Sequence, residues 1–139
     1  MSLARFGVSL EKELLLKFDS LCRENKYENR SEAIRDLIRD ELVRKEWSNP
    51  KGEVTGVVTL VYDHEKRDLV DKLIDIQHGY DSVIIVASQH VHLNHDNCLE
   101  AIIVKGSAKD AKDFAAKLKS VKGVKHGELV MATIGKDIG

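Results

Sequence analysis

Proline and cysteine are scarce in this chain of 139 residues, and each scarcity excludes a class of protein. One proline and 42% hydrophobic residues argue against a disordered, proline-rich chain and indicate a globular one. Only two cysteines occur, Cys22 and Cys98, so there is no disulfide framework and we expect a cytoplasmic protein. No apolar run approaches the roughly 20 residues of a membrane span, and no signal-peptide pattern opens the chain, so we expect no membrane partner.

The chain also lacks an excess of charge of either sign. Its formal net charge is −1, and residues 1–50 contain ten Lys and Arg against ten Asp and Glu. This balance argues against non-specific nucleic-acid binding, for which a basic excess is typical. Any DNA-binding function must therefore depend on where individual charges lie.

The first 50 residues predict one short strand and two helices. Residues 5–10 alternate strictly between apolar and polar side chains, as in a half-buried strand. Residues 11–25 form an amphipathic helical pattern, with Cys22 on its apolar stripe as a core residue. Ser31 is a suitable N-cap for a second helix, which should fade near residues 47–50 because the residue before a proline disfavours helix.

A lone strand with two helices cannot bury its apolar faces, so we expect two copies of the strand to pair as an antiparallel ribbon in a dimer. Such a ribbon fits the major groove of DNA with Arg5, Gly7 and Ser9 facing the base edges. The backbone amides at the Ser31 helix start would suit a phosphate, with Arg30 beside them. The alternative is a plain helical hairpin with an accessory strand.

The rest of the chain alternates strand and helix after a linker at residues 49–53. The pattern predicts strands at 54–62, 82–93, 99–105 and 124–134, and helices at 65–77 and 108–120. This order, β-α-β-β-α-β, is the ferredoxin-like split unit. We therefore predict an α+β protein with a DNA-binding domain at residues 1–48 and a ferredoxin-like domain at 54–139.

Histidine and cysteine cluster in residues 90–98. Side chains at i and i+2 of a strand point the same way, so His90 and His92 should project from one face. Residues 94–97 are turn-prone, which should bring Cys98 back beside them on the adjoining strand. Two imidazoles and a thiolate suit nickel, copper or zinc, whereas calcium and magnesium prefer oxygen. Square-planar coordination would indicate Ni(II) or Cu(II), and tetrahedral coordination zinc.

A fourth ligand is needed, and His78 at the end of the third predicted helix is the best candidate. Whether it comes from the same chain or a neighbouring one is open at this point. His95 is expected in the turn outside the ligand set, and His64 and His126 are expected to lack partners. A Cys–His hydrolase is the enzymatic rival, but two histidines on one strand face favour chelation, so we predict no enzyme.

Three segments carry a resemblance to one family. They are residues 29–36 (Asn-Arg-Ser-Glu-Ala-Ile-Arg-Asp), residues 64–69 (His-Glu-Lys-Arg-Asp-Leu) and residues 90–100 (His-Val-His…His-Asp-x-Cys-Leu-Glu). In this order they resemble the nickel-responsive ribbon-helix-helix repressors, over a span from Arg5 to about Gly127. The resemblance implies a homotetramer in which two ribbon dimers flank a core of four ACT-like regulatory domains.

The resemblance further implies one square-planar Ni(II) per subunit at the tetramer interface. His90, His92 and Cys98 would come from one subunit and His78 from another. Nickel would favour binding to a palindromic, double-stranded operator and repression of nickel uptake genes, with no small-molecule substrate.

Several positions match the DNA-contacting residues of this family. Arg5 and Ser9 match base-reading strand positions, whereas Gly7 departs from the usual hydroxyl-bearing residue there. Lys66 and Arg67 match loop residues that touch the DNA backbone. Two acidic residues, Glu32 and Asp36, match those that hold a cation between the domains in the DNA-bound form.

One spacing departs from the family. Eleven residues separate His78 from His90, one more than the family spacing. An extra residue inside a strand would reverse its faces, so we expect it in the loop at 79–81 or as a β-bulge. Two alternatives to nickel control remain: another metal such as copper, cobalt or zinc, or a small-molecule ligand of the ACT-like domain.

Overall fold

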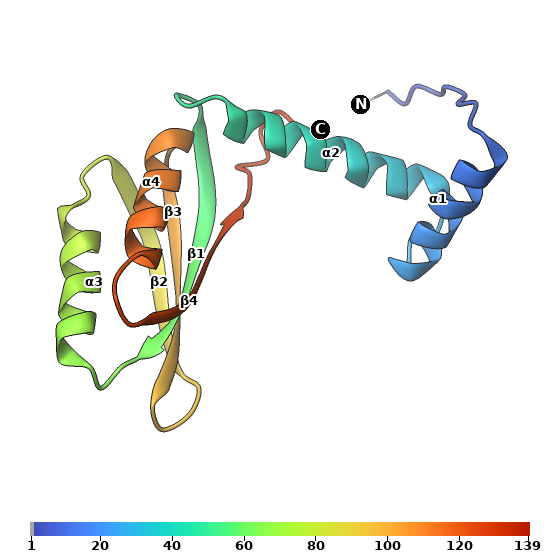
Figure 1. Cartoon of the computed structure of the whole chain (residues 1–139). Helices are drawn as coiled ribbons and strands as arrows, with labels where there is room; N and C mark the ends of the chain where they lie inside the picture. The colour runs from blue at the N-terminus through green and yellow to red at the C-terminus, as the bar shows by residue number, and fades with distance from the viewer. Residues whose placement is uncertain (1) are drawn as a thin grey trace. The chain divides into compact units, whose positions relative to one another are not determined.

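The computed structural model describes residues 2–139, which form two compact units, residues 2–40 and Glu41–Gly139 (Figure 1). The division falls inside one helix, α2 (Arg30–Ser48), whereas the sequence places the boundary between residues 48 and 54. No helix in the described part of the chain is both long and apolar enough to cross a membrane.

The first unit contains α1 (Lys12–Glu24) and the first part of α2. Cys22 is buried on the inner side of α1, as its apolar stripe predicts. The predicted strand at 5–10 is not formed: residues 2–10 have no regular secondary structure and are exposed. The physical reason is that a strand needs a hydrogen-bonded neighbour, and the described residues of a single chain supply none to this segment.

The start of α2 corrects one sequence prediction. The helix begins at Arg30, and the side-chain oxygen of Asn29 accepts a hydrogen bond from the backbone N–H of Glu32 at 2.9 Å. Asn29 is therefore the N-cap, and Ser31 lies in the first turn. Both residue types are good caps, so the choice depends on which side chain reaches the free amide.

The second unit has the predicted element order and an antiparallel sheet. Its elements are β1 (Glu53–Asp63), α3 (Arg67–Gly79), β2 (Val83–His92), β3 (Asn97–Ser107), α4 (Ala108–Lys119) and β4 (Val124–Met131). The strands lie in the order β2-β3-β1-β4, with α3 and α4 on one face (Figure 1). The α+β, ferredoxin-like prediction is thus confirmed.

Strict alternation along β1 and β3 explains which face the helices cover. Every second residue of β1 from Val54 to Tyr62 is buried, and so are Cys98, Glu100, Ile102 and Val104 on β3. These side chains meet the apolar stripes of the two helices, in a core that includes Leu60, Leu69, Leu73, Phe114 and Leu118. Neither α3 nor α4 covers the opposite face of the sheet.

Candidate metal centre

The β2–β3 hairpin places three predicted ligands on the same face of the sheet. In its antiparallel register His90 lies opposite Glu100, and His92 lies opposite Cys98. Residues directly opposite in a ladder point to the same side. His90, His92 and Cys98 therefore share the face on which the helices pack.

A β-bulge in β2 decides this orientation. The register passes from Ile85 opposite Val104 to Ala87 opposite Ile103, so Val86 is the extra residue. Before it, Val83 and Ile85 point to the core side of the sheet; after it, the even-numbered residues face that side, although they are exposed. Without the bulge His90 and His92 would point to the opposite face. A β-bulge, one of the two locations expected for the extra residue, is thus present in β2.

Deleting Val86 is therefore expected to leave the metal centre in place. The ladder would run without interruption from Ile85 to Ala87, and every other side chain of β2 would keep its face. Nickel stoichiometry, measured by equilibrium dialysis, should equal that of the unaltered protein. As a matched control, deleting Ala101 from the regular strand β3 would reverse either Cys98 or Ile102 and should abolish binding. Loss of nickel in the Val86 deletion would contradict this role of the bulge.

Cys98 is buried, and its chemistry reflects that burial. The side chain is 0% exposed, and its thiol donates a hydrogen bond to the backbone oxygen of Tyr62 at 3.4 Å. Burial raises the pKa of the Cys98 thiol. A metal ion would have to displace a proton that the buried thiol retains at neutral pH, so metal binding there would release a proton.

His90 and His92 are exposed, and aromatic neighbours hold their rings. The two imidazoles lie edge to face with centroids 5.7 Å apart, and the ring of His90 stacks on Tyr62 at 5.9 Å. The ring of His92 stacks on His64, with centroids 4.2 Å apart and an angle of 13° between planes.

The prediction that His64 lacks a partner is therefore wrong. His64 follows β1, whose end pairs with the start of β3, so the fold carries it to the hairpin that holds His92. Its Nδ1 is buried and has no hydrogen-bond partner among the described residues. His126 also has a neighbour, Glu128, with Nε2 4.0 Å from the carboxylate. The contact of His64 has no local sequence signal, because it depends on strand register, whereas His126 and Glu128 are two residues apart on β4.

The donor set fits a borderline-soft metal ion, although the side chains do not yet meet at one point. Two imidazoles and one thiolate are ligands that nickel accepts. The donor atoms of His90, His92 and Cys98 are not all within 4.8 Å of one another in the described chain, because the rings pack on Tyr62 and His64 and the sulfur faces a backbone oxygen. Side-chain rotation would be needed to close the site.

A second group of donor atoms is shared between the hairpin turn and the loop that joins β1 to α3. Glu65, His95 and Asp96 have ligand atoms within 4.8 Å of one another, and all three residues are exposed. His95 is paired with Asp96 at 3.0 Å, and this hydrogen bond raises the pKa of His95. Exposed groups of this kind are common on protein surfaces, and His95 lies in the turn as predicted.

His78 lies apart from the other predicted ligands within the chain. It is exposed in the last turn of α3, on the side that carries Ile74 and Asp75. Leu69 and Leu73 on the opposite side of the helix are buried in the core against the sheet. The side chain of His78 therefore projects away from the sheet that carries His90 and His92.

A buried carboxylate beside the site was not foreseen. Glu100, opposite His90, is 9% exposed. Its carboxylate accepts hydrogen bonds from the hydroxyl of Tyr62 at 2.7 Å and from the amide of Gln77 at 3.4 Å. Burial and this carboxylate raise the pKa of the Tyr62 hydroxyl well above its usual range. The alternation of β3 could have indicated that Glu100 points inward, but not which residues satisfy it.

Replacing Tyr62 by phenylalanine is expected to lower the free energy of unfolding by about 1–3 kcal/mol, because a buried carboxylate loses its shortest hydrogen bond. Urea denaturation would measure the change. Tyr80→Phe is the matched control, since the Tyr80 ring packs on Phe114 and its hydroxyl makes no hydrogen bond within the described chain. Equal stability losses in both variants would contradict a structural role for the Tyr62–Glu100 bond.

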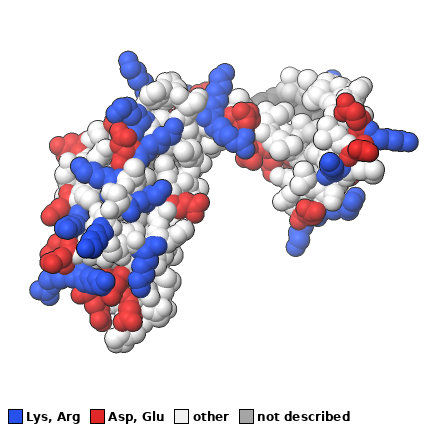
Figure 2. All heavy atoms as spheres, in the orientation of Figure 1, with Lys and Arg blue, Asp and Glu red and all other residues white. Residues whose placement is uncertain are grey.

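The predicted DNA-contacting residues are exposed, but one already has a partner. Arg5, Gly7 and Ser9 lie in the irregular segment before α1, and Lys66 and Arg67 lie at the start of α3. In contrast, Arg30 makes a two-pronged ion pair with Asp19 of α1, with both N–O distances 2.9 Å. Positive and negative side chains are interspersed over the visible face, in line with the balanced composition (Figure 2).

The two acidic residues expected at a second cation site are also engaged. The carboxylate of Glu32 pairs with Arg35 one turn further along α2. Asp36 accepts a hydrogen bond from the hydroxyl of Tyr27 at 2.8 Å. These contacts would have to be shared or released if the carboxylates bound a cation.

Comparison with known proteins gives two family matches that together span most of the chain. Residues 4–45 match the ribbon-helix-helix protein, copG family, and residues 55–132 match the NikR C terminal nickel binding domain. Among solved structures, an uncharacterized protein from Thermotoga maritima superposes with a TM-score of 0.51 at 12% identity, over 58% of this chain and 99% of that one. That likeness concerns the fold alone.

Curated relatives match over nearly their whole length. A nickel-responsive regulator of Pyrococcus furiosus is 56% identical over 138 residues, which is 99% of each chain. One of Thermococcus kodakarensis is 53% identical over the same share. One of Nitratidesulfovibrio vulgaris is 54% identical over 134 residues, 96% of each chain.

Proposed function

This chain belongs to the family of nickel-responsive regulators, and from that premise we propose which of its residues bind nickel and DNA. It is a nickel-dependent DNA-binding repressor and not an enzyme. His90, His92 and Cys98 would hold the ion. The observation that carries this proposal is the β2–β3 register, which aligns the three side chains on one face of the sheet.

His78 of another subunit would complete each site, with one Ni(II) per subunit. Support comes from the placement of His78 on the exposed side of α3, pointing away from the sheet of its own chain. His90 and His92 are likewise exposed on a part of β2 that their own helices leave open. Bound nickel would supply a bridge of coordinate bonds between subunits. These histidines and Cys98 would present the donor atoms, and the aromatic rings beside them would limit the access of water.

A homotetramer would also bury apolar surface that a single chain leaves exposed. The face of the sheet opposite the helices is largely apolar and includes Val57, Val61, Val91, Leu99, Ile103 and Val130. Contiguous apolar faces of this kind mark interfaces in soluble proteins. We assign this face to contact with a second copy of the regulatory domain.

The amino-terminal unit also exposes apolar surface that a second copy of the chain would bury. Its exposed apolar side chains include Phe6, Val8, Leu10, Leu14, Leu16, Leu21, Leu37 and Ile38. Pairing residues 5–10 with the same segment of a second chain would form a ribbon and bury this surface. Arg5, Gly7 and Ser9 would then face the major groove, and the two-fold symmetry of the ribbon would match a palindromic operator.

Nickel control would follow from the way the ligands join subunits. The nickel-bound arrangement of the four regulatory domains would favour those positions of the two amino-terminal ribbons, the DNA-binding arms, that fit one operator. In that case nickel and DNA must each strengthen the binding of the other. Lys66 and Arg67 would touch the DNA backbone, as would the Ser31 amide and Arg30 once Arg30 shares its charge with a phosphate. In that state Glu32 and Asp36 would hold a cation. We propose nickel uptake genes as the targets and the cytoplasm as the compartment.

Nickel loading is expected to tighten DNA binding by at least about tenfold, within the usual range of allosteric coupling. The probe is a duplex enriched from a randomised DNA pool with the nickel-loaded protein, and its Kd is measured at fixed salt with and without nickel. Copper, cobalt and zinc are compared in the same assay. Equal Kd values for the metal-free and nickel-loaded protein would contradict the proposed mechanism.

A further inference from the structure

The last turns of α2 are built into the second unit. Trp47 is 1% exposed and packs in a small core with Val54, Ala108 and Ala111. The indole lies so close to β1 that a Cβ on Gly56 would meet its ring at 3.2 Å. The sequence pattern indicates only that a helix ends here, whereas the structure makes its terminal tryptophan part of the regulatory domain.

Hydrogen bonds hold this end of the helix from two sides. The indole N–H of Trp47 donates to the backbone oxygen of Ala132 at 2.9 Å, directly after β4. The backbone oxygen of Trp47 accepts from the Lys112 ammonium of α4, also at 2.9 Å. The helix end is thus tied to β4 and α4 as well as packed against β1.

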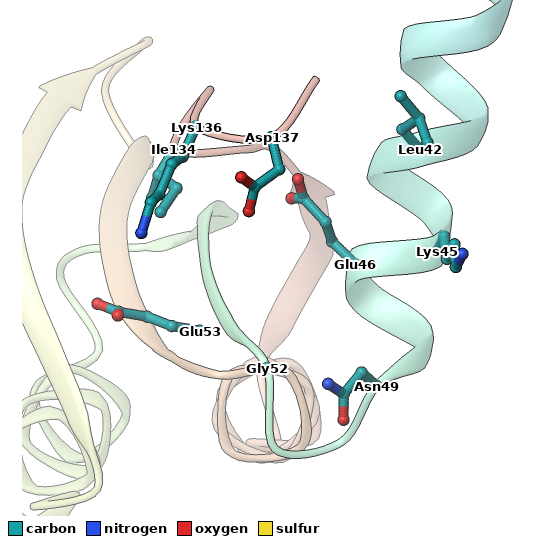
Figure 3. A pocket seen from close by; sticks show the side chains of 9 residues that line it. All are labelled: Leu42, Lys45, Glu46, Asn49, Gly52, Glu53, Ile134, Lys136 and Asp137. Atoms are coloured by element: carbon teal, nitrogen blue, oxygen red, sulfur yellow. The ribbon is translucent and has the colours of Figure 1, made fainter. Parts of the chain in front are cut away.

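The carboxy-terminal segment after β4 adds a strap along the same helix end. The backbone N–H of Ala132 donates to the backbone oxygen of Thr55 on β1 at 3.1 Å. The hydroxyl of Thr133 then donates to the carboxylate of Glu46, 3.1 Å away. Figure 3 shows Ile134, Lys136 and Asp137 of this segment around an open cleft of about 460 Å³ that Glu46 and other α2 residues also line.

The link between α2 and β1 is tied down as well, which removes a hinge at residues 49–52. The backbone oxygen of Gly52 accepts from the N–H of Ala108 at 2.9 Å, and that of Pro50 accepts from Lys109 at 3.1 Å. Both donors belong to the first turn of α4. The segment between the end of α2 and β1 is therefore held in place by hydrogen bonds.

We propose that Trp47 and the strap at residues 132–137 form a clamp that transmits the metal state of the sheet to the DNA-binding arm. The clamp contacts β1, β1 pairs with β3, and β3 carries Cys98. The other end of α2 begins in the first unit, and the helix is continuous from Arg30 to Ser48. A rearrangement of the sheet would therefore move the helix end instead of being absorbed by a flexible linker. This inference rests on the proposed nickel control of DNA binding.

Two full-length variants and one truncation test the clamp. Trp47→Phe keeps an aromatic ring but removes the bond to Ala132, and Thr133→Val removes the bond to Glu46. Truncation after Ala132 removes residues 133–137 of the strap and keeps the Ala132 oxygen that accepts from Trp47. Lys136→Gln is the matched control, because Lys136 lies on the same segment and has no hydrogen bond or ion pair within the described chain.

Each protein is assayed for nickel stoichiometry, for oligomeric state and for the ratio of Kd values for the enriched duplex without and with nickel. Combining Trp47→Phe with the truncation is expected to leave nickel stoichiometry unchanged while the Kd ratio falls about tenfold, with intermediate losses in the single changes. Hydrogen exchange provides a readout without DNA. Nickel should slow exchange of amides 30–40 in the unaltered protein and in Lys136→Gln, but not in the combined variant.

The outcomes separate the clamp from the function on which it rests. If the unaltered protein binds DNA equally with and without nickel, the proposed function is contradicted. If the unaltered protein responds to nickel and the combined variant responds to the same extent, the function stands and the clamp is overturned. If the combined variant does not fold, Trp47→Phe and Thr133→Val alone decide, and an unchanged Kd ratio in both overturns the clamp.

Discussion

Cys98→Ala is expected to lower nickel affinity by more than about a hundredfold, since residues that merely support metal ligands already contribute roughly 10- to 100-fold. The substitution removes the only sulfur donor on the hairpin, and none of the neighbouring side chains can supply a thiolate. Competition with a chelator of known affinity measures the change. The absorption band of a nickel–thiolate complex should disappear at the same time.

Cys22→Ala is the matched control for this experiment. Cys22 is the other cysteine of the chain and is buried in α1, within the first unit. Its replacement should leave the nickel band and the nickel affinity unchanged, whatever it does to stability. A Cys98→Ala protein that binds nickel like the unaltered protein would overturn the assignment of the site, and a band lost only in Cys22→Ala would relocate it.

Ile103→Asp is expected to dissociate the tetramer and, with it, the nickel sites. Ile103 lies on the face of the sheet without helices, between Val57 on β1 and Ala87 on β2, and is 40% exposed in the single chain. A carboxylate there costs little in an isolated subunit. Buried against a second copy it would be an unpaired charge, which is destabilising by several kcal/mol.

Sedimentation equilibrium measures this dissociation, and nickel stoichiometry is recorded on the same samples. If His78 comes from another subunit, both quantities should fall together. Ala116→Asp is the control, because Ala116 is exposed on α4, on the other side of the domain. A monodisperse tetramer of Ile103→Asp with full nickel would show that this sheet face is not the interface.

Periodicity was sufficient for the fold of the second unit because it is a local property. Each apolar alternation or helical stripe records which face of one element is buried, so six elements in order define the split β-α-β-β-α-β unit. The start of α3 shows that periodicity does not determine the exact ends of an element. Residue 65 suits a helix, but the side chain of Asp63 accepts from the Glu65 amide and holds a turn, and the helix begins at Arg67.

The candidate site was predictable where it depended on spacing along one hairpin, and not where it depended on register between strands. His90, His92 and Cys98 follow from a two-residue strand repeat and a short turn. The contact of His64 with His92 and the burial of Glu100 beside Tyr62 required the pairing of β1 with β3. Residues far apart in sequence acquire such neighbours only when the sheet closes.

The scarcity of proline, cysteine and net charge, together with the apolar patterning, determined by themselves that this is a globular α+β chain with one soft-donor hairpin. Only the tertiary structure decided on which face of the sheet the donor side chains of that hairpin lie. The ladder of β2 is interrupted at Val86, because Val83 and Ile85 enter the core while β3 aligns His90 and His92 with its own buried residues. A bulge satisfies both demands. Likewise, the sequence pattern gave no role to Trp47, the single tryptophan. In the structure it holds the end of α2, because its indole N–H donates to the backbone oxygen of Ala132, 85 residues away in sequence.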